Sequence, residues 1–397
     1  MNRSDFTILN NIIYFDNSAT TLKPKCVIDK MNDYYTNYPS NIHRGEYNIS
    51  FKADEEYNKA REIVASFLNA NKDEIVFTSG TTDALNMAIY GYYKNILHEG
   101  DEVILTYAEH ASLVLPFMDL ENILGIKIKY ARLDDNNHLN IDSIKNIITD
   151  KTKVIALAQV TNVIGDIRPI KEISMIAKEK GISLLVDGAQ SVPHMKVDVK
   201  DLGCDFLAFS GHKICGPTGI GVLYGKKELL NQIISTKLGG GMNSSFDDKD
   251  HIILKDVPIR LEAGTPNISG AIGLGEAINY INNIGIDNIY KHECDLKAYF
   301  MDKVKDISYI KIFNNKADSG IISFIIDGIF PQDVGYYLNK YNICVRTGNH
   351  CAKLLKNETG IDQSIRVSLY FYNTKEEIDK LVNLLSDKER IMKEMLI

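Results

Sequence analysis

The cysteines of this chain form no Cys-x-x-Cys pair. The six cysteines are dispersed at positions 26, 204, 215, 294, 344 and 351. This spacing excludes a disulfide framework and a zinc knuckle, and we expect no bound metal. Dispersed thiols are typical of a reducing compartment, and residues 1–6, Met-Asn-Arg-Ser-Asp-Phe, contain no apolar signal core. We therefore expect a cytoplasmic protein.

Three further features are missing from the sequence. No apolar run approaches the length of a membrane span, so we expect no membrane partner. The net charge of -7 argues against binding to nucleic acid, which usually requires a basic face. No Gly-x-Gly-x-x-Gly follows the first expected strand, which argues against a dinucleotide dehydrogenase. The composition, 45% hydrophobic and 24% charged, is that of an ordinary globular protein, and 397 residues suggest two or three domains.

Short apolar runs alternate with helical patterns in the first 224 residues. Strands separated by helices are typical of an α/β fold, so we predict a parallel or mostly parallel sheet that is covered on both faces. The expected strands are 75–78, 102–106, 127–131, 154–160, 183–187, 206–209 and 221–224.

The pattern changes after residue 266, where a long helix is expected over 269–284. The later strands are predicted at 309–313, 321–326, 343–346 and 365–369, and the last helix begins with the capping box Thr374-x-x-Glu377. We expect a large α/β domain over 16–268 and a smaller α+β domain over 269–397, with residues 1–15 packed on the smaller domain. The polar stretch 243–250 is predicted to be a mobile loop.

Lys213 ends the stretch Ser210-Gly-His-Lys, which follows an expected strand. A lysine on a tight turn is placed to bind an aldehyde covalently, and Ser210 and His212 beside it can bind an anion. Pyridoxal phosphate (PLP) enzymes need both groups. Taken alone, Lys213 is more often a solvated lysine in a glycine-rich loop.

Other expected strands also end in polar residues. Asp187 suits the protonated ring nitrogen of PLP, and Gln190 suits its ring hydroxyl. Residues 80–82, Gly-Thr-Thr, open a helix whose first N–H groups suit a phosphate. His110 and Asn162 follow two more strands. Each has an ordinary alternative, such as a turn-capping Asp, an N-cap Thr or a structural loop His, but their convergence favours one cofactor site.

The smaller domain contains a second candidate centre, Val345-Arg-Thr-Gly-Asn-His-Cys351. The neighbouring Arg346 and His350 can lower the pKa of the Cys351 thiol and make it nucleophilic. Arg366, at the start of a later strand, can grip a substrate carboxylate with two hydrogen bonds. The alternatives are a small buried cysteine and a surface salt bridge.

Together these motifs resemble the cysteine desulfurases of the aminotransferase class V family, in particular the Suf-type (group II) branch. The resemblance runs from about Tyr14 to the final helix. Its motifs are 14–20 (YFDNSAT), 40–45 (SNIHRG), 79–82 (SGTT), 109–111 (EHA), 186–190 (VDGAQ), 210–213 (SGHK), 262–267 (EAGTPN) and 346–351 (RTGNHC).

The resemblance implies the fold type I of PLP-dependent transferases, with the active site at a homodimer interface. It implies that Lys213, Cys351 and His110 are catalytic and that PLP is held by Lys213, Asp187, Gln190 and the stacked ring of His110. The phosphate contacts that it implies are Thr81, Thr82, Ser210, His212 and, from the partner subunit, Thr265. The substrate contacts that it implies are His43, Arg44, Asn162, Arg346 and Arg366.

The activity implied is the conversion of L-cysteine to L-alanine, with a persulfide left on Cys351 for an unidentified acceptor protein, for iron–sulfur cluster assembly or a related pathway. The loop departs from the branch, since Asn349 replaces a histidine, and the proline that is usual three residues after the cysteine is missing, with Leu354 in its place. Two alternatives stay open: a selenocysteine lyase, and a transaminase or epimerase of the same fold in which Cys351 is incidental.

Overall fold

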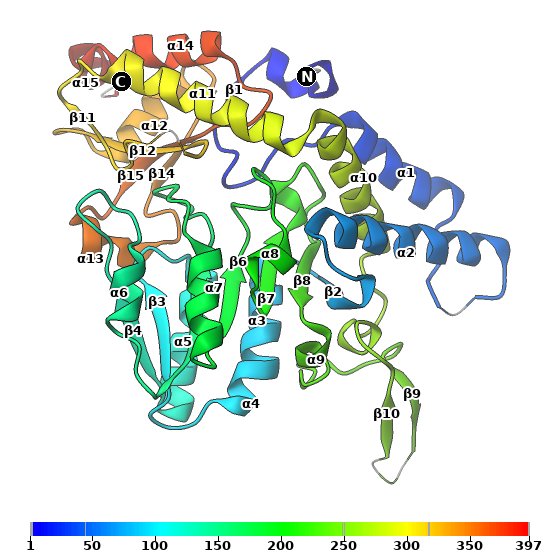
Figure 1. Ribbon diagram of the computed structural model, residues 1–397. Helices are drawn as coiled ribbons and strands as arrows, with labels where there is room; N and C mark the ends of the chain where they lie inside the picture. Colours follow the sequence, from blue (N-terminus) through cyan, green and yellow to red (C-terminus); the bar gives the residue numbers. More distant parts are fainter. Residues whose placement is uncertain (1–2, 44, 248, 250, 317, 396–397) are drawn as a thin grey trace.

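A seven-stranded sheet forms the centre of the larger part of the molecule. The computed structural model describes residues 3–43, 45–247, 249, 251–316 and 318–395 (Figure 1). The strand order is β2 (Ile75–Thr78), β8 (Gly221–Gly225), β7 (Phe206–Ser210), β6 (Ser183–Asp187), β5 (Thr152–Ala158), β3 (Glu102–Thr106) and β4 (Lys127–Ala131). The run from β7 to β4 is parallel, and β8 is antiparallel to both of its neighbours. The predicted mostly parallel α/β sheet is confirmed.

Helices cover both faces of this sheet because successive strand residues point to opposite sides. In β3, Val103 and Leu105 pack with α3 (Thr81–Ala88) and α5 (Ala111–Leu124). Ile104 points to the other face, which belongs to a separate core. Helices that contribute to that second core are α1 (Lys25–Asn37), α2 (Asn48–Leu68), α6 (Ile141–Lys145), α7 (Ile170–Glu179), α8 (Val199–Leu202) and α10 (Ile268–Ile284). The remaining helices of this part are α4 (Lys94–Ile96) and α9 (Lys227–Leu230).

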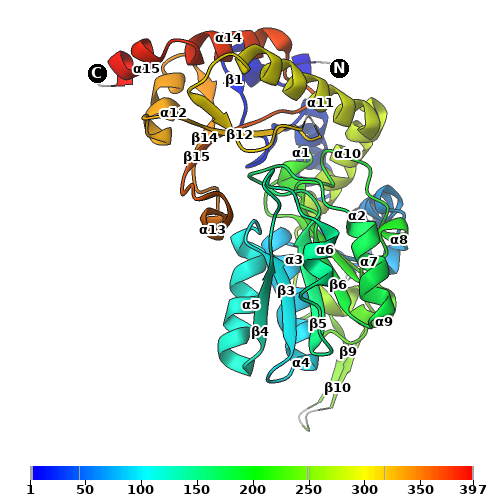
Figure 2. The same ribbon diagram turned by 60° about the vertical axis from the view of Figure 1, so that its left-hand side comes forward.

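A second, antiparallel sheet lies above the first in Figures 1 and 2. Its order is β11 (Ile310–Ile312), β12 (Ile321–Ile326), β15 (Ser364–Ser368) and β14 (Arg346–Gly348). The helices of this part are α11 (Ile286–Val304), α12 (Pro331–Asn339), α13 (Lys356–Thr359), α14 (Lys375–Leu385) and α15 (Lys388–Met395). The strand expected over 343–346 is interrupted at Val345, which separates β13 (Ile343–Cys344) from β14.

The N-terminal segment runs along the second sheet. The short strand β1 (Ile13–Tyr14) pairs in parallel with β13, and Phe15 lies in the core of the smaller part. The guanidinium of Arg3 forms an ion pair of 2.8 Å with Glu377. Glu377 also completes the predicted capping box with Thr374 at the start of α14. The beginning of the chain is therefore fixed to the last third of the sequence.

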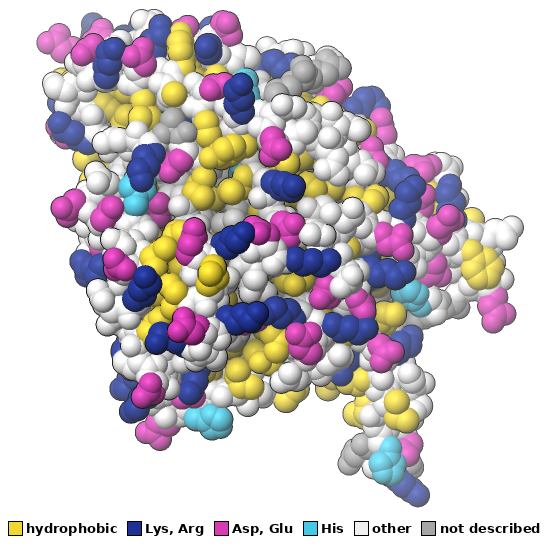
Figure 3. Space-filling model, in the orientation of Figure 1, with side chains coloured by type: hydrophobic (Ala, Val, Ile, Leu, Met, Phe, Trp, Pro, Cys, Tyr) yellow, Lys and Arg dark blue, Asp and Glu magenta, His cyan; other side chains and the backbone are white. Residues whose placement is uncertain are grey.

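A hairpin of β9 (Asn243–Phe246) and β10 (Ile252–Leu254) projects from the body of the molecule (Figures 1 and 3). The prediction of a loop from residue 243 was wrong for its first four residues, because backbone pairing with β10 forms a strand despite the polar side chains. On the face shown in Figure 3, acidic and basic side chains are interspersed. Within the described part of the chain, no helix is long and apolar enough to cross a membrane.

Candidate active site

A cavity of about 220 Å³ lies where the strands β5, β6 and β7 end. The carboxyl ends of parallel strands are the usual place for a ligand in an open α/β sheet. The cavity wall brings together most of the residues predicted from the sequence: Thr81, Thr82, His110, Asn162, Asp187, Gln190, Ser210, His212, Lys213, Arg346 and Arg366.

Lys213 ends a short 3-10 helix, Gly211–Lys213, that directly follows β7. The turn is tight, since a Cβ at Gly211 would lie 2.7 Å from Cγ2 of Ile220. The Nζ of Lys23 donates a hydrogen bond of 3.1 Å to the carbonyl oxygen of His212 and so stabilises the turn. Burial lowers the pKa of Lys213 to about 8, and the charges of Arg366 and Arg346 act in the same direction. A substantial fraction of this amine is therefore uncharged near pH 8.

Asp187 is the last residue of β6 and is buried. Burial raises the pKa of its carboxyl, while the N–H of Ala189, which donates to Oδ1 at 2.9 Å, and the charge of Lys213 oppose the rise. Gln190 donates from Nε2 to the carbonyl oxygen of Ser18 at 2.8 Å. Its other atom, Oε1, is buried and has no hydrogen-bond partner in the described part of the protein.

His110 caps the N-terminus of α5. Its Nδ1 accepts a hydrogen bond of 3.1 Å from the backbone N–H of Ser112. Burial lowers the pKa of His110 to about 4, helped by the charges of Lys213, Arg346 and Arg366. The imidazole is therefore neutral at physiological pH, and its proton lies on Nε2 because Nδ1 is an acceptor.

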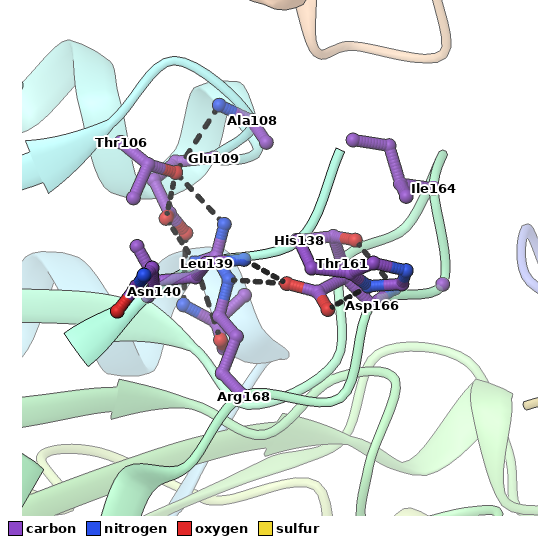
Figure 4. Close-up of polar contacts among 12 residues, drawn as sticks. Thr106, Ala108, Glu109, His138, Leu139, Asn140, Thr161, Ile164, Asp166 and Arg168 are labelled. Carbon is purple, nitrogen blue, oxygen red and sulfur yellow. Dashed lines mark hydrogen bonds and ion pairs between the residues drawn. The ribbon is translucent and has the colours of Figure 1, made fainter. Parts of the chain in front are cut away.

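A buried ion pair supports the turn that carries His110 (Figure 4). The guanidinium of Arg168 binds the carboxylate of Glu109, and neither side chain is exposed. Arg168 also donates to Oγ1 of Thr106 at 2.8 Å, and Glu109 accepts the N–H of Ala158 at 2.8 Å. Because Thr106 ends β3 and Ala158 ends β5, the pair joins two strand ends beneath the cavity.

The same network reaches the loop that carries Asn162. Nε of Arg168 lies 3.7 Å from Oδ2 of Asp166, whose other oxygen contacts Nδ1 of His138 at 2.7 Å (Figure 4). The N–H of Asp166 donates to Oγ1 of Thr161 at 3.1 Å. The positions of His110 and Asn162 thus depend on one buried set of charges.

The start of α3 forms another wall of the cavity. Thr81 is the first residue of this eight-residue helix, and its backbone N–H donates to Oγ of Ser210 at 2.7 Å. The hydroxyl of Thr82 lies 2.7 Å from the hydroxyl of Ser112. Free N–H groups and hydroxyls at a helix N-terminus suit a phosphate group.

These residues fit PLP. The cavity offers an amine of lowered pKa, a buried carboxylate and a helix N-terminus with hydroxyls. It also contains two buried amide oxygens, Oε1 of Gln190 and Oδ1 of Asn162, that have no partner within the described ranges of the chain. Unpaired buried polar atoms are rare in proteins, and a polar ligand in the cavity would satisfy them.

The loop after β14 brings the Cys351 region to the same cavity. Cys351 is exposed, its carbonyl oxygen accepts the N–H of Ala111 at 2.8 Å, and its Sγ lies 3.9 Å from Nη2 of Arg346. His350 and Cys351 both have left-handed backbone angles, with φ of 51° and 59°. The side chain of Asn349 accepts the N–H of Cys351 at 3.3 Å and so supports this turn.

Arg366 lies on β15 and is almost completely buried. Its Nη1 donates to the carbonyl oxygen of Asn162 at 2.9 Å, and its Nε has no partner among the described residues. Nδ2 of Asn162 donates to the carbonyl oxygen of His350 at 2.7 Å. Asn162 therefore joins the predicted carboxylate-binding arginine to the cysteine loop.

Three of the predicted residues that the structure describes do not line this cavity: Cys351, whose neighbours Arg346 and His350 do line it, Thr265 and His43. Thr265 is exposed, and its hydroxyl accepts a hydrogen bond of 3.2 Å from Asn41. His43 is exposed and lies 2.8 Å from Asp54. Arg44 lies outside the described residues. Both Thr265 and His43 belong to a separate region of the surface around residues 41–43 and 264–266.

Other residues of the site were not singled out from the sequence. Ser18 and Ser112 line the cavity, and Asp16 contacts Arg366. Asp16 and Ser18 lie inside the 14–20 motif, which was the only signal that could have identified them. Ser112 follows His110 by two residues and gave no signal of its own.

Comparison with known proteins identifies the family. The family model described as Aminotransferase class-V matches residues 13–381. The chain belongs to this family. Among the class V aminotransferases it is 42% identical to a probable cysteine desulfurase of Halalkalibacterium halodurans, over 93% of this chain and 91% of that protein. It is also 38% identical to a cysteine desulfurase of Haloferax volcanii, over 94% of this chain and 88% of that protein.

Solved structures of class V aminotransferases have the same fold. An apo cysteine desulfurase of Thermococcus onnurineus NA1 superposes with a TM-score of 0.94 at 37% identity, over 98% of this chain and 97% of that one. The cysteine desulfurase CsdA of Escherichia coli, in its S-sulfonic acid form, gives 0.92 at 34% identity with the same coverage. The predicted PLP-dependent fold type I is confirmed.

Proposed function

We propose that this protein is a PLP-dependent cysteine desulfurase, which converts L-cysteine to L-alanine and leaves a persulfide on Cys351. The observation that carries the proposal is an exposed thiol whose neighbours, Arg346 and His350, line the PLP-type cavity. The named cysteine desulfurases among the relatives support it.

Residues from both parts of the molecule would hold the cofactor and move protons. Lys213 would bind PLP covalently, Asp187 would face its ring nitrogen, and the corner of Thr81, Thr82 and Ser210 would hold its phosphate. When bound, PLP supplies an electron sink for negative charge at the α-carbon of an amino acid. The Nζ of Lys213, with its pKa lowered to about 8, is suited to take the α-proton of the substrate and to return a proton later.

The substrate is held by its carboxylate and attacked at its sulfur. Arg366 and Asn162 would bind the carboxylate, with Arg346 nearby. The Cys351 thiolate forms a bond to the substrate sulfur while the carbon–sulfur bond of the substrate breaks. The electron pair of the broken bond stays with the carbon, which is finally protonated, so L-cysteine and a thiol give L-alanine and a persulfide.

We also propose a homodimer, with Thr265 and His43 of one subunit facing the cavity of the other. Their exposure and their distance from the cavity of their own chain support this arrangement. We propose a Suf-type desulfurase that supplies sulfur for iron–sulfur clusters through an acceptor protein. Six free thiols support a cytoplasmic, reducing location.

The test is incubation of the PLP-loaded protein with L-cysteine, followed by measurement of alanine and of the mass of the Cys351 peptide. We expect a gain of one sulfur atom on that peptide and the release of alanine. Cys351→Ser should abolish both, whereas Cys344→Ser, on the neighbouring β13, should abolish neither.

Equal turnover by Cys351→Ser would contradict the proposal and would favour a transaminase or epimerase. A much faster reaction with L-selenocysteine than with L-cysteine in the same assay would instead identify a selenocysteine lyase.

A further inference from the structure

The part of the cavity proposed to bind the substrate carboxylate contains two arginines. Arg346 on β14 and Arg366 on β15 are directly opposite each other in the antiparallel register, and both line the cavity. Like charges directly opposite each other on two strands destabilise a sheet. Burial and the charge of Arg346 lower the pKa of Arg366 to about 10, against the opposing effect of Asp16. The fold therefore needs negative charge at this place.

Asp16 provides that charge. Its Oδ1 lies 3.1 Å from Nη2 of Arg366, whose guanidinium is almost fully buried, while the Asp16 side chain keeps 25% exposure. Burial raises the pKa of the Asp16 carboxyl, and the charges of Arg366, Arg346 and Lys213 oppose the rise. Asp16 thus lies within the electrostatic reach of all three cations of the cavity.

The backbone holds Asp16 firmly in this position. Asp16 pairs with Ser368, two residues after Arg366, through an isolated parallel bridge, and its carbonyl oxygen accepts the N–H of Ala19 at 3.1 Å. The backbones of Asp16 and Arg366 are therefore both attached to β15. These contacts keep the backbone of Asp16 within side-chain reach of Arg366.

The charges of Arg346, Arg366 and Asp16 suit one class of ligand, amino acids with a single carboxylate. With Asp187 assigned to the ring nitrogen of PLP, the carboxylate-binding end is lined by Arg346 and Arg366, and Asp16 contacts Arg366 from outside the cavity lining. These three side chains together carry a net charge of one positive unit. An amino acid with an uncharged side chain brings one carboxylate, which balances this charge. A second acidic group on the substrate side chain would meet the negative charge of Asp16 in a poorly hydrated cavity, where like charges repel strongly.

We propose that Asp16 is the specificity-determining residue that restricts this pocket to amino acids with a single carboxylate. It orients Arg366 through Nη2, while Nε, which has no partner among the residues that the structure describes, is left for the ligand. This inference rests on the proposed function, in which Arg366 binds the substrate carboxylate. In this inference, Asp16 makes the pocket bind amino acids with one carboxylate more tightly than amino acids with two.

The test measures binding to the PLP-loaded protein by calorimetric titration with L-alanine and with L-aspartate. In Asp16→Asn we expect the ratio of the dissociation constant for L-aspartate to that for L-alanine to fall at least tenfold, about 1.4 kcal/mol. The double variant Asp16→Asn/Arg346→Gln restores the net charge and should bring the ratio back towards the wild-type value. An unchanged ratio in Asp16→Asn, or no recovery in the double variant, would overturn the inference.

Arg3→Gln is the matched control, because it loosens the N-terminal segment at its ion pair with Glu377 without changing the charge of the cavity. A fall in the ratio equal to that of Asp16→Asn would show that loosening, not charge, is the cause. If Asp16→Asn does not fold, Asp16→Glu decides, since a retained charge must keep the wild-type ratio and a tenfold fall would contradict the inference. Neither titration needs desulfuration, so a failure to form alanine from L-cysteine refutes the proposed function and leaves this test intact.

Discussion

At the scale of single residues, the histidines of the cavity differ most from histidines in water. Burial lowers the pKa of His110 and His212 to about 4 and that of His350 to about 3, and neighbouring cations contribute in each case. These side chains are therefore neutral in the folded protein, although an unfolded histidine has a pKa of about 6.5. Below that pH the unfolded chain binds more protons, so stability falls as the pH falls.

His350 gives the clearest test of this effect. Between about pH 7.5 and pH 5, we expect the free energy of unfolding to fall by about 2 kcal/mol less in His350→Gln than in the wild type. The reason is that the unfolded variant has no histidine at position 350 to take up a proton. The measurement is the urea midpoint at the two pH values.

His251→Gln is the control, since the side chain of His251 is 74% exposed. It should keep the wild-type loss of stability. The same acid sensitivity in His350→Gln as in the wild type would contradict the lowered pKa.

At the scale of elements, the Glu109–Arg168 pair joins the ends of β3 and β5. We expect Arg168→Met to lower the free energy of unfolding by about 3–5 kcal/mol, because it leaves the Glu109 carboxylate buried without its cation. The double variant Glu109→Gln/Arg168→Met should be less destabilised than Arg168→Met alone, since no buried charge remains. Urea denaturation measures both changes.

Lys171→Met is the control for that experiment. Lys171 pairs with Asp201 on the surface, where both side chains are more than half exposed, so its removal should cost less than about 1 kcal/mol. The losses of unfolding free energy in Glu109→Gln and in Arg168→Met can be added and compared with the loss in the double variant. Equality of the two values would refute an energetic coupling between Glu109 and Arg168.

Helices and strands were predictable from the sequence where the burial of apolar residues determines them. Most strands of the central sheet are short runs with a buried apolar centre, such as residues 103–105 of β3, and each strand lies within one or two residues of its predicted place. β9 was missed because its residues are polar and its strand state depends on pairing with β10. The interruption at Val345 was missed because it arises from the change of partner, from β1 for β13 to β15 for β14.

The site was predictable to the extent that its residues follow strands. Asp187 is the last residue of β6 and Lys213 lies just beyond the end of β7, so strand prediction and the position rule for α/β sheets indicate both residues. Asp16 and Arg168 were not predictable in this way. Each acts through a contact with a residue more than fifty positions away, and no local pattern specifies such a contact. The division at residue 268 stays a prediction.

At the scale of the whole molecule, Thr265 is exposed and outside the cavity of its own chain. If it serves the other subunit, mixed dimers of Lys213→Ala and Thr265→Ala should contain one fully wild-type site. We expect mixed dimers, obtained by refolding the two variants together, to have about half of the wild-type number of PLP-binding sites and about half of the wild-type activity. The measurement is PLP titration of tagged, purified mixed dimers.

The control for this experiment is a mixture of Lys213→Ala with Asp187→Asn. Both residues line one cavity of one chain, so no mixed dimer would contain an intact site. If the Thr265→Ala mixture behaved in the same way as this control, the proposed placement of Thr265 against the other subunit would be wrong.

Asp16 and Arg366 are attached to the four-stranded sheet, whereas Lys213 and Asp187 end strands of the seven-stranded sheet. A bound amino acid would therefore be held at its two ends by residues of two different sheets. The covalent bonds of the amino acid fix the distance between these two ends. The spacing between the two sheets would therefore select for the fixed separation of amine and carboxylate that all α-amino acids share.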